Sequence, residues 1–235
     1  MTCSDEGIVI SSIKYSESSQ IVRFFCAKEG LISAMVRSTS KKSGVSKAYL
    51  SPFFILELVY TRSSRADLIT LKEVSGGIEN IRLSDSIHKL ALCLFSGELL
   101  RNILEPGYSN TELFHFLKNK QQELRDMEQP GSAWSVLLVL GIIQNLGFTI
   151  ESKSEKDALF NVQEGTFSLE HQLGNPFTLD STLSGALAQM INGHEPPMDK
   201  SLNARLLNAL LDFLGFHVQG FKKPKSLEVL REVYL

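Results

Sequence analysis

The chain has 235 residues, and its 43% hydrophobic and 21% charged residues are those of a globular protein, which excludes a disordered one. Its longest strongly apolar run, residues 136–143, is far short of the ~20 residues that cross a bilayer, so no transmembrane helix is expected. The net charge of −2 is uneven, because residues 1–77 carry ten Lys and Arg against seven Asp and Glu, whereas the remainder carries fourteen against nineteen. Two modules with different partners are therefore expected.

The first 77 residues have the pattern of a small β-barrel. Short runs of β-branched and aromatic residues alternate with turn signals rich in serine, lysine and glycine. Alternation is clearest in the third run, where Ile32, Ala34 and Val36 share one face. Five short strands in this length suit a closed or partly open barrel. The predicted strands cover residues 7–15, 20–26, 31–37, 53–60 and 67–75.

From residue 80 onward the apolar residues follow a helical period. The third helix is expected to begin at Ser132 as N-cap and to end at Gly147, and Asp180 and either Asp199 or Ser201 are the later N-cap candidates. A polar and β-rich stretch interrupts the pattern and predicts a small hairpin. The predicted helices cover residues 82–104, 111–127, 132–147, 180–192, 201–218 and 226–233.

The first residues and the cysteines argue for a reducing compartment. The first residues are acidic and polar, unlike a secretory signal peptide, so we expect a cytoplasmic protein. Cys3, Cys26 and Cys93 form no CxxC pair, and neither a disulfide framework nor a cysteine-rich zinc site is expected from them.

The main candidate site is basic. Positive residues gather at the end of the third strand, in the long loop after it and between the last two strands, where only Glu57 opposes them. Loops so placed flank the groove that binds single-stranded nucleic acid in small barrels, and phosphates need only well-placed positive charge. Phe24, Phe53 and Phe54 are assigned to the barrel core rather than to base stacking. In order of preference, the predicted DNA contacts are Arg37, Lys41, Lys42 and Lys47, then Arg62 and Arg65, then Lys14 and Arg23.

Catalysis has little support in the residues. The stretch from His194 to Asp199 contains Glu195, but prolines break any helix there and no second histidine completes a zinc-protease motif. GxSxG, Walker A and GxGxxG motifs do not occur. We expect no catalytic residues, and a reaction centred on Glu195 is the least favoured hypothesis.

The order and spacing of several segments resemble the RecO family of bacterial recombination mediators. The front segments are GIVI from Gly7, YSESSQIVRFF from Tyr15, EGLISAMVR from Glu29 and LSPFFILEL from Leu50. The stretch from Leu206 to Phe216 and KSLEVL from Lys225 are similar to the family's closing helices. The resemblance implies an α+β protein, with a five-stranded OB-fold barrel over residues 1–78 and a helical domain over residues 79–235.

The resemblance also implies a non-enzymatic role in DNA repair and recombination after DNA damage, on the nucleoid. Such a protein binds single- and double-stranded DNA and anneals complementary strands. Its implied partners are RecR and the C-terminal tail of single-stranded DNA-binding protein, and RecA is loaded indirectly. That acidic tail ends in an apolar residue and needs an apolar pocket with a basic rim. The rim candidates in the helical domain are Arg101, Lys118, Lys120, Arg125 and Lys153.

The inserted subdomain, residues 149–178, departs from the family. Many members hold zinc there with four cysteines, whereas residues 149–175 contain none. Because a tetrahedral zinc site of that kind needs thiolates, we expect no metal and no other cofactor. An apolar cluster is expected instead, made of Phe160, Val162, Phe167 and Leu169.

A second departure lies in the basic loop, where Ser38 stands at a position that is often glycine in the family. This leaves the placement of Lys41 and Lys42 open. The alternative function is an OB-fold adaptor that binds only protein, and strong salt-dependent DNA binding would exclude it.

Overall fold

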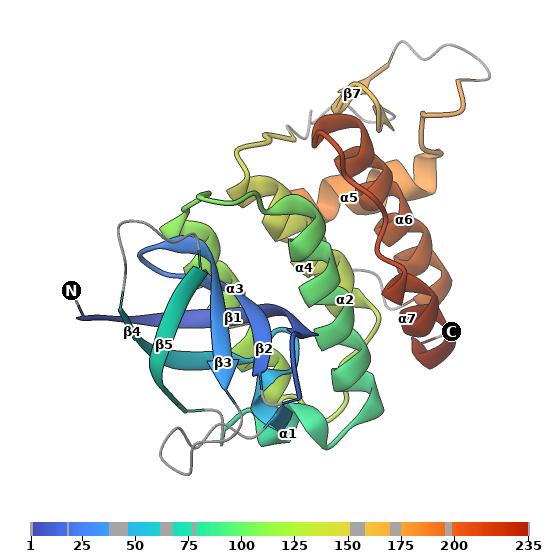
Figure 1. Cartoon of the computed structure of the whole chain (residues 1–235). Helices are drawn as coiled ribbons and strands as arrows, with labels where there is room; N and C mark the ends of the chain where they lie inside the picture. Colours follow the sequence, from blue (N-terminus) through green and yellow to red (C-terminus); the bar gives the residue numbers. More distant parts are fainter. Residues whose placement is uncertain are drawn as a thin grey trace. The chain divides into compact units, whose positions relative to one another are not determined.

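The computed structural model describes residues 2–17, 19–37, 47–61, 68–76, 79–150, 158–169, 175–195 and 199–234. The predicted α+β fold is confirmed, because five strands form a barrel and helices follow (Figure 1). The chain divides into two compact units, Met1–Gln129 with Pro224–Val233 and Pro130–Lys223 with Tyr234–Leu235. Within the described ranges no helix is long and apolar enough to cross a membrane.

The barrel is closed, with the strand order β1-β2-β3-β5-β4. Its neighbouring strands are antiparallel except for β3 and β5, which run parallel. Closure pairs both sides of every barrel strand, which removes the exposed edges on which sheets aggregate. The strands are β1 (Thr2–Lys14), β2 (Ser19–Cys26), β3 (Gly30–Arg37), β4 (Ile55–Thr61) and β5 (Leu68–Ser75).

Alternating residues fill the barrel. The predicted inward row of β3 is confirmed, since Ile32, Ala34 and Val36 are all buried. The assignment of Phe24, Phe53 and Phe54 to the core is also correct. The β4 side chains that complete this core are Leu56, Leu58 and Tyr60.

Helices α1 (Ile81–Ser84), α2 (Ile87–Ile103) and α3 (Thr111–Asp126) belong to the same unit as the barrel. The prediction of one continuous helix over residues 82–104 is wrong. The chain breaks at Asp85 and Ser86, where the Ser86 hydroxyl accepts a hydrogen bond from the backbone of His88 and caps α2. The expected division after residue 78 separates barrel from helices, but the compact unit runs on through α3, because these helices pack on the barrel.

The second unit contains α4 (Ala133–Asn145), α5 (Ser181–Ile191) and α6 (Lys200–His217). Asp180 caps α5 and Asp199 caps α6, each through a 2.9 Å hydrogen bond to a backbone N–H, as predicted. Ser132 stands at the N-cap position of α4 as predicted, but its backbone is already helical and its side chain makes no capping hydrogen bond.

The predicted hairpin in the inserted subdomain is present as β6 (Leu159–Asn161) and β7 (Thr166–Ser168). Gly165 turns the chain with a φ of 71°, which a residue without Cβ adopts easily. Phe160, Val162 and Phe167 are buried as predicted, but Leu169 is 52% exposed and does not join their cluster.

The last helix, α7 (Ser226–Tyr234), is tied to α2 by a carboxylate. Glu98 Oε2 accepts a 2.8 Å hydrogen bond from the Ser226 backbone. Burial alone would raise the pKa of Glu98, but the hydrogen bonds from Ser226 and Lys225, together with the charge of Arg101, hold it below its ordinary value.

The lowered pKa of Glu98 predicts acid-sensitive stability. A group whose pKa falls on folding stabilises the protein above its unfolded pKa, and that contribution is lost as pH falls through the folded pKa. Glu98→Gln should therefore lower the free energy of unfolding by about 1 kcal/mol at pH 7, and by less at pH 3–4. Urea titrations at both pH values measure this. Substitution of exposed Glu105→Gln is the control, and an equal loss there would contradict the role of Glu98.

Gly97 allows α2 to approach the barrel closely. A Cβ at Gly97 would lie 2.5 Å from the Pro52 Cβ and 3.1 Å from the Ile10 carbonyl oxygen. We expect Gly97→Ala to destabilise the protein by about 1–3 kcal/mol, measured by chemical denaturation. A Cβ at Gly185 in α5 would have nothing within 4 Å. Gly185→Ala should be neutral or stabilising by up to about 1 kcal/mol, and a similar loss at both glycines would refute the packing explanation.

Candidate nucleic-acid interface

The structure describes some of the predicted DNA contacts fully, others by their backbone alone, and others not at all. Lys14 and Arg23 have described side chains, whereas Arg37 and Lys47 are placed by their backbones, at the end of β3 and the start of the short 3-10 helix Lys47–Leu50. The remaining four lie outside the described residues: Lys41, Lys42, Arg62 and Arg65.

An apolar row crosses the outer face of three barrel strands. Val22 and Phe24 of β2 point into the core, so their neighbours in sequence point outward. Ile21 of β2 lies opposite Ile13 of β1 and Met35 of β3. Ile13 is 64% exposed, and Ile21 and Met35 are half-buried.

Arg23 is the next outward residue of β2 after Ile21. It lies between Ser11 of β1 and Ser33 of β3, two residues with small side chains. Arg23 is half-buried. A cation thus adjoins an apolar row on a face that small barrels of this topology use for oligonucleotides.

The open end of this face carries further groups that suit DNA. Lys14 ends β1 and is exposed, and Tyr15 directly after it is 64% exposed. Lys14 lies opposite Gln20, and the adjacent Ser19 lies opposite Arg37. Lys14, Tyr15 and the backbone of Arg37 therefore share one end of the three strands.

The other end of the face is covered by α3. Phe25 of β2 packs on Phe114, with ring centroids 6.2 Å apart. The turn into β3 is fixed to the chain before α3, since the Leu31 N–H donates to the Tyr108 carbonyl at 3.0 Å. Gly30 is required there, because its φ is 70° and a Cβ would lie 2.1 Å from that oxygen.

The opposite wall of the barrel is acidic. Glu57 on β4 and Glu73 on β5 are exposed, and Glu6 on β1 is half-exposed. The Lys118 ammonium of α3 donates to both carboxylate oxygens of Glu6 at 2.7 Å. A polyanion is consequently favoured on the face that carries Arg23 rather than on this wall.

Several of the cations predicted to form a basic rim for an acidic tail are paired with carboxylates in the structure. Besides Lys118, Lys120 pairs with Glu123 at 2.8 Å and Arg101 with Glu98 at 3.1 Å. Lys153 lies outside the described residues. The rim remains a prediction.

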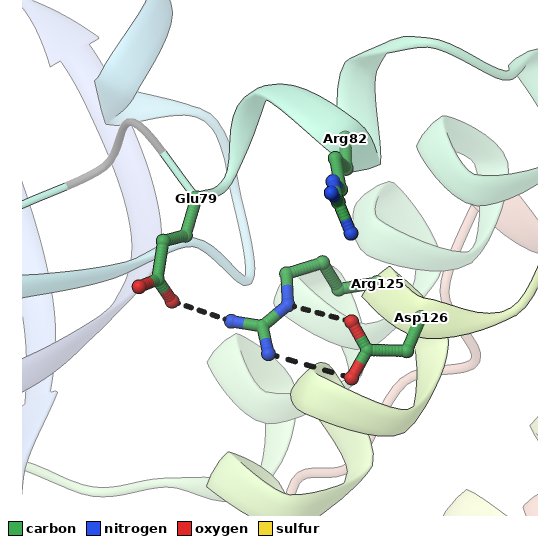
Figure 2. A pocket seen from close by; sticks show the side chains of 4 residues that line it. All are labelled: Glu79, Arg82, Arg125 and Asp126. Atoms are coloured by element: carbon green, nitrogen blue, oxygen red, sulfur yellow. Dashed lines mark hydrogen bonds and ion pairs between the residues drawn. The ribbon is translucent and has the colours of Figure 1, made fainter.

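Arg125 lies in a charged cavity of about 320 Å³ (Figure 2). Its Nη1 is 2.6 Å from Glu79 Oε2, and its Nε and Nη2 face the two oxygens of Asp126. Hydrogen bonding to Asp126 raises the pKa of Arg125 and lowers that of Asp126. Both edges of the guanidinium are thereby occupied, so Arg125 serves to hold α3 to the chain before α1. Arg82 lines the same cavity.

A neighbouring groove of about 330 Å³ shares Glu79 and Arg125 with this cavity. A buried chain of hydrogen bonds lies along it, in which Gln121 Nε2 donates to Asn80 Oδ1 at 2.6 Å and Asn80 Nδ2 donates to the Ile55 carbonyl at 2.9 Å. These amides position α3 against β4.

The inserted subdomain does not fit the zinc site that the resemblance associates with it. Residues 149–175 contain no cysteine, and two of the described residues there, Phe160 and Phe167, are buried aromatic rings. Phe160 packs on Phe167 with centroids 5.0 Å apart and on Phe213 of α6 at 6.4 Å.

Sequence reasoning missed the outward apolar row. Its signal is the alternation in β2, where Ile21 and Arg23 occupy the positions between core residues Val22 and Phe24. The row itself depends on strand register, which a single sequence does not give.

A closed barrel with this strand order, followed by helices, defines an OB-fold protein. Residues 1–76 match the family model described as Recombination protein O N terminal. The DNA repair proteins RecO of Flavobacterium psychrophilum and Flavobacterium johnsoniae are 31% and 30% identical to this chain, over the full length of both. That of Porphyromonas gingivalis is 24% identical over 97% of each chain. The chain belongs to the RecO family, as the resemblance predicted.

Proposed function

We propose that this chain is a non-enzymatic DNA repair mediator that holds single-stranded DNA on the outer face of β1, β2 and β3. The observation that carries the proposal is the uncovered apolar row of Ile13, Ile21 and Met35, with Arg23 beside it. Unstacked bases bury apolar surface on such a row, and the guanidinium serves the phosphates. The names of the relatives support a repair role.

Flanking loops extend the contact to the backbone of the strand. Lys14 and Tyr15 lie at the open end of the face, where an aromatic ring offers a stacking surface. Arg37, Lys41, Lys42, Lys47, Arg62 and Arg65 are the further proposed phosphate contacts. Because these contacts neutralise phosphates without reading base edges, binding is tolerant of sequence and sensitive to salt.

Strand annealing follows from the same contacts. Neutralised phosphates let a second strand approach, while the base edges of the first remain free to pair. Double-stranded DNA binds through its phosphates alone.

The chain acts on nucleoid DNA with RecR and the acidic tail of single-stranded DNA-binding protein, and so assists RecA loading. Arg101, Lys118, Lys120, Arg125 and Lys153 are the proposed tail contacts.

The second candidate function is a protein-only adaptor. The exposure of Ile13, at 64%, is what favours it, because an apolar surface of this kind also suits a protein partner. Salt dependence separates the two functions, since counterion release accompanies DNA binding and scarcely contributes to an apolar protein contact.

Fluorescence anisotropy of a labelled oligo-dT strand across a salt series tests the proposal. The wild-type chain should bind, with affinity falling linearly in a double-logarithmic plot. Lys14→Ala with Arg23→Ala should weaken binding and reduce the slope by about 1.4, since each lost single-strand phosphate contact removes about 0.7. A variant with Arg37, Lys41, Lys42 and Lys47 changed to Ala should reduce the slope further.

Lys72→Ala is the matched control. Lys72 is exposed on β5, and its ammonium donates to Thr2 Oγ1 on the acidic side of the barrel. Removal of this charge should leave the slope within experimental error. If the wild-type chain does not bind oligo-dT at low salt, or if Lys72→Ala costs as much as the double variant, the barrel face is not the DNA site.

A further inference from the structure

Two phenylalanine rings are exposed side by side on the second unit. Phe177 and Phe216 are 38% and 45% exposed, and their ring centroids are 5.0 Å apart at an interplanar angle of 81°. The buried aromatic cluster of Phe160, Phe167 and Phe213 already fills the space under the hairpin. The exposed pair is therefore not needed to complete that core.

The backbone at both rings is fixed by hydrogen bonds, in a turn at Phe177 and in a helix at Phe216. The Phe177 N–H donates to Asn175 Oδ1 at 2.9 Å, and its carbonyl accepts from the Val162 N–H at 2.9 Å. Phe216 lies in the last turn of α6. An aromatic surface fixed in this way loses little conformational entropy when a flat ligand stacks on it.

Positive charge adjoins the pair. After α6 the chain turns back, with the Phe221 N–H donating to the Val218 carbonyl at 3.2 Å. The ring of Phe221 comes within 4.0 Å of the Cβ position at Gly215, the residue before Phe216. Lys222 and Lys223 follow directly, and both are exposed. Lys223 pairs with Asp212 of α6 at 2.7 Å.

We propose that Phe177 and Phe216 form a second binding surface for single-stranded nucleic acid, distinct from the barrel face. Bases stack on the exposed rings, and the lysines that follow Phe221 contact phosphates. The combination of exposed aromatic rings with exposed cations close to them in the chain favours a nucleic acid over a protein partner. The inference rests on the proposed function, because a second strand site lets one chain hold two strands for annealing.

A tryptophan reporter tests the surface directly. Trp134 is the only tryptophan and is 2% exposed, so its emission should respond little to DNA. Phe216→Trp places an indole on the proposed surface. Addition of unlabelled oligo-dT should quench the new emission saturably, because thymine stacks on the indole. Wild-type chain measured in parallel is the control.

The barrel variant separates the two sites. With Lys14→Ala and Arg23→Ala added to Phe216→Trp, quenching should persist although anisotropy shows weaker overall binding. If anisotropy shows bound DNA and the indole is not quenched, the strand lies elsewhere and this inference is wrong. If no DNA binds to the wild-type chain at low salt, the proposed function itself fails, and the inference fails with it.

Annealing kinetics provide a second readout that does not depend on the reporter. Phe177→Leu with Phe216→Leu keeps apolar side chains but removes both rings. Annealing of complementary oligonucleotides should slow about fivefold or more, while binding of a single strand by the barrel stays within about twofold. Leu94→Ala, at an exposed apolar residue of α2, is the matched control. An unchanged annealing rate in the double variant, or an equal loss in the control, would overturn the inference.

Discussion

The open face of β1, β2 and β3 depends on how the turn between β2 and β3 is fixed to the chain before α3. Gly30 makes this possible, because its φ is 70° and a Cβ at this position would lie 2.1 Å from the Tyr108 carbonyl oxygen. The Asp5 carboxylate closes the same turn from the barrel side by accepting the N–H groups of Lys28 and Glu29. With this end of the strands covered, the opposite end of the face is left for a ligand.

Local patterns predicted much of the fold. The alternation that buries Ile32, Ala34 and Val36 and the aspartate cap at Asp180 are properties of a few neighbouring residues, and both were predictable. The break before α2 was not, because the apolar stripe continues through it and only the bond from His88 to Ser86 marks the new start. Family membership was predictable from the order of segments.

The site was harder to predict, because it depends on register and on pairing across long stretches of chain. A count of charges along the sequence ranks the loop lysines above Arg23. Only the strand register shows that Arg23 lies beside the row of Ile21, Ile13 and Met35. Charge counting also treats Lys118 as a free cation. Glu6, far earlier in the chain, neutralises it on the folded barrel.

The aromatic cluster of the inserted hairpin changes what that subdomain responds to. A thiolate-bound metal couples folding to chelators, oxidants and proton concentration, since cysteines must be deprotonated to bind. Rings of Phe160, Phe167 and Phe213 carry no such chemistry. Apolar burial of these rings contributes to holding the hairpin, and the strength of that contribution depends on temperature and weakens on cooling. In the described part of the hairpin, heating and cooling therefore act on the contacts that occupy the place of thiolates.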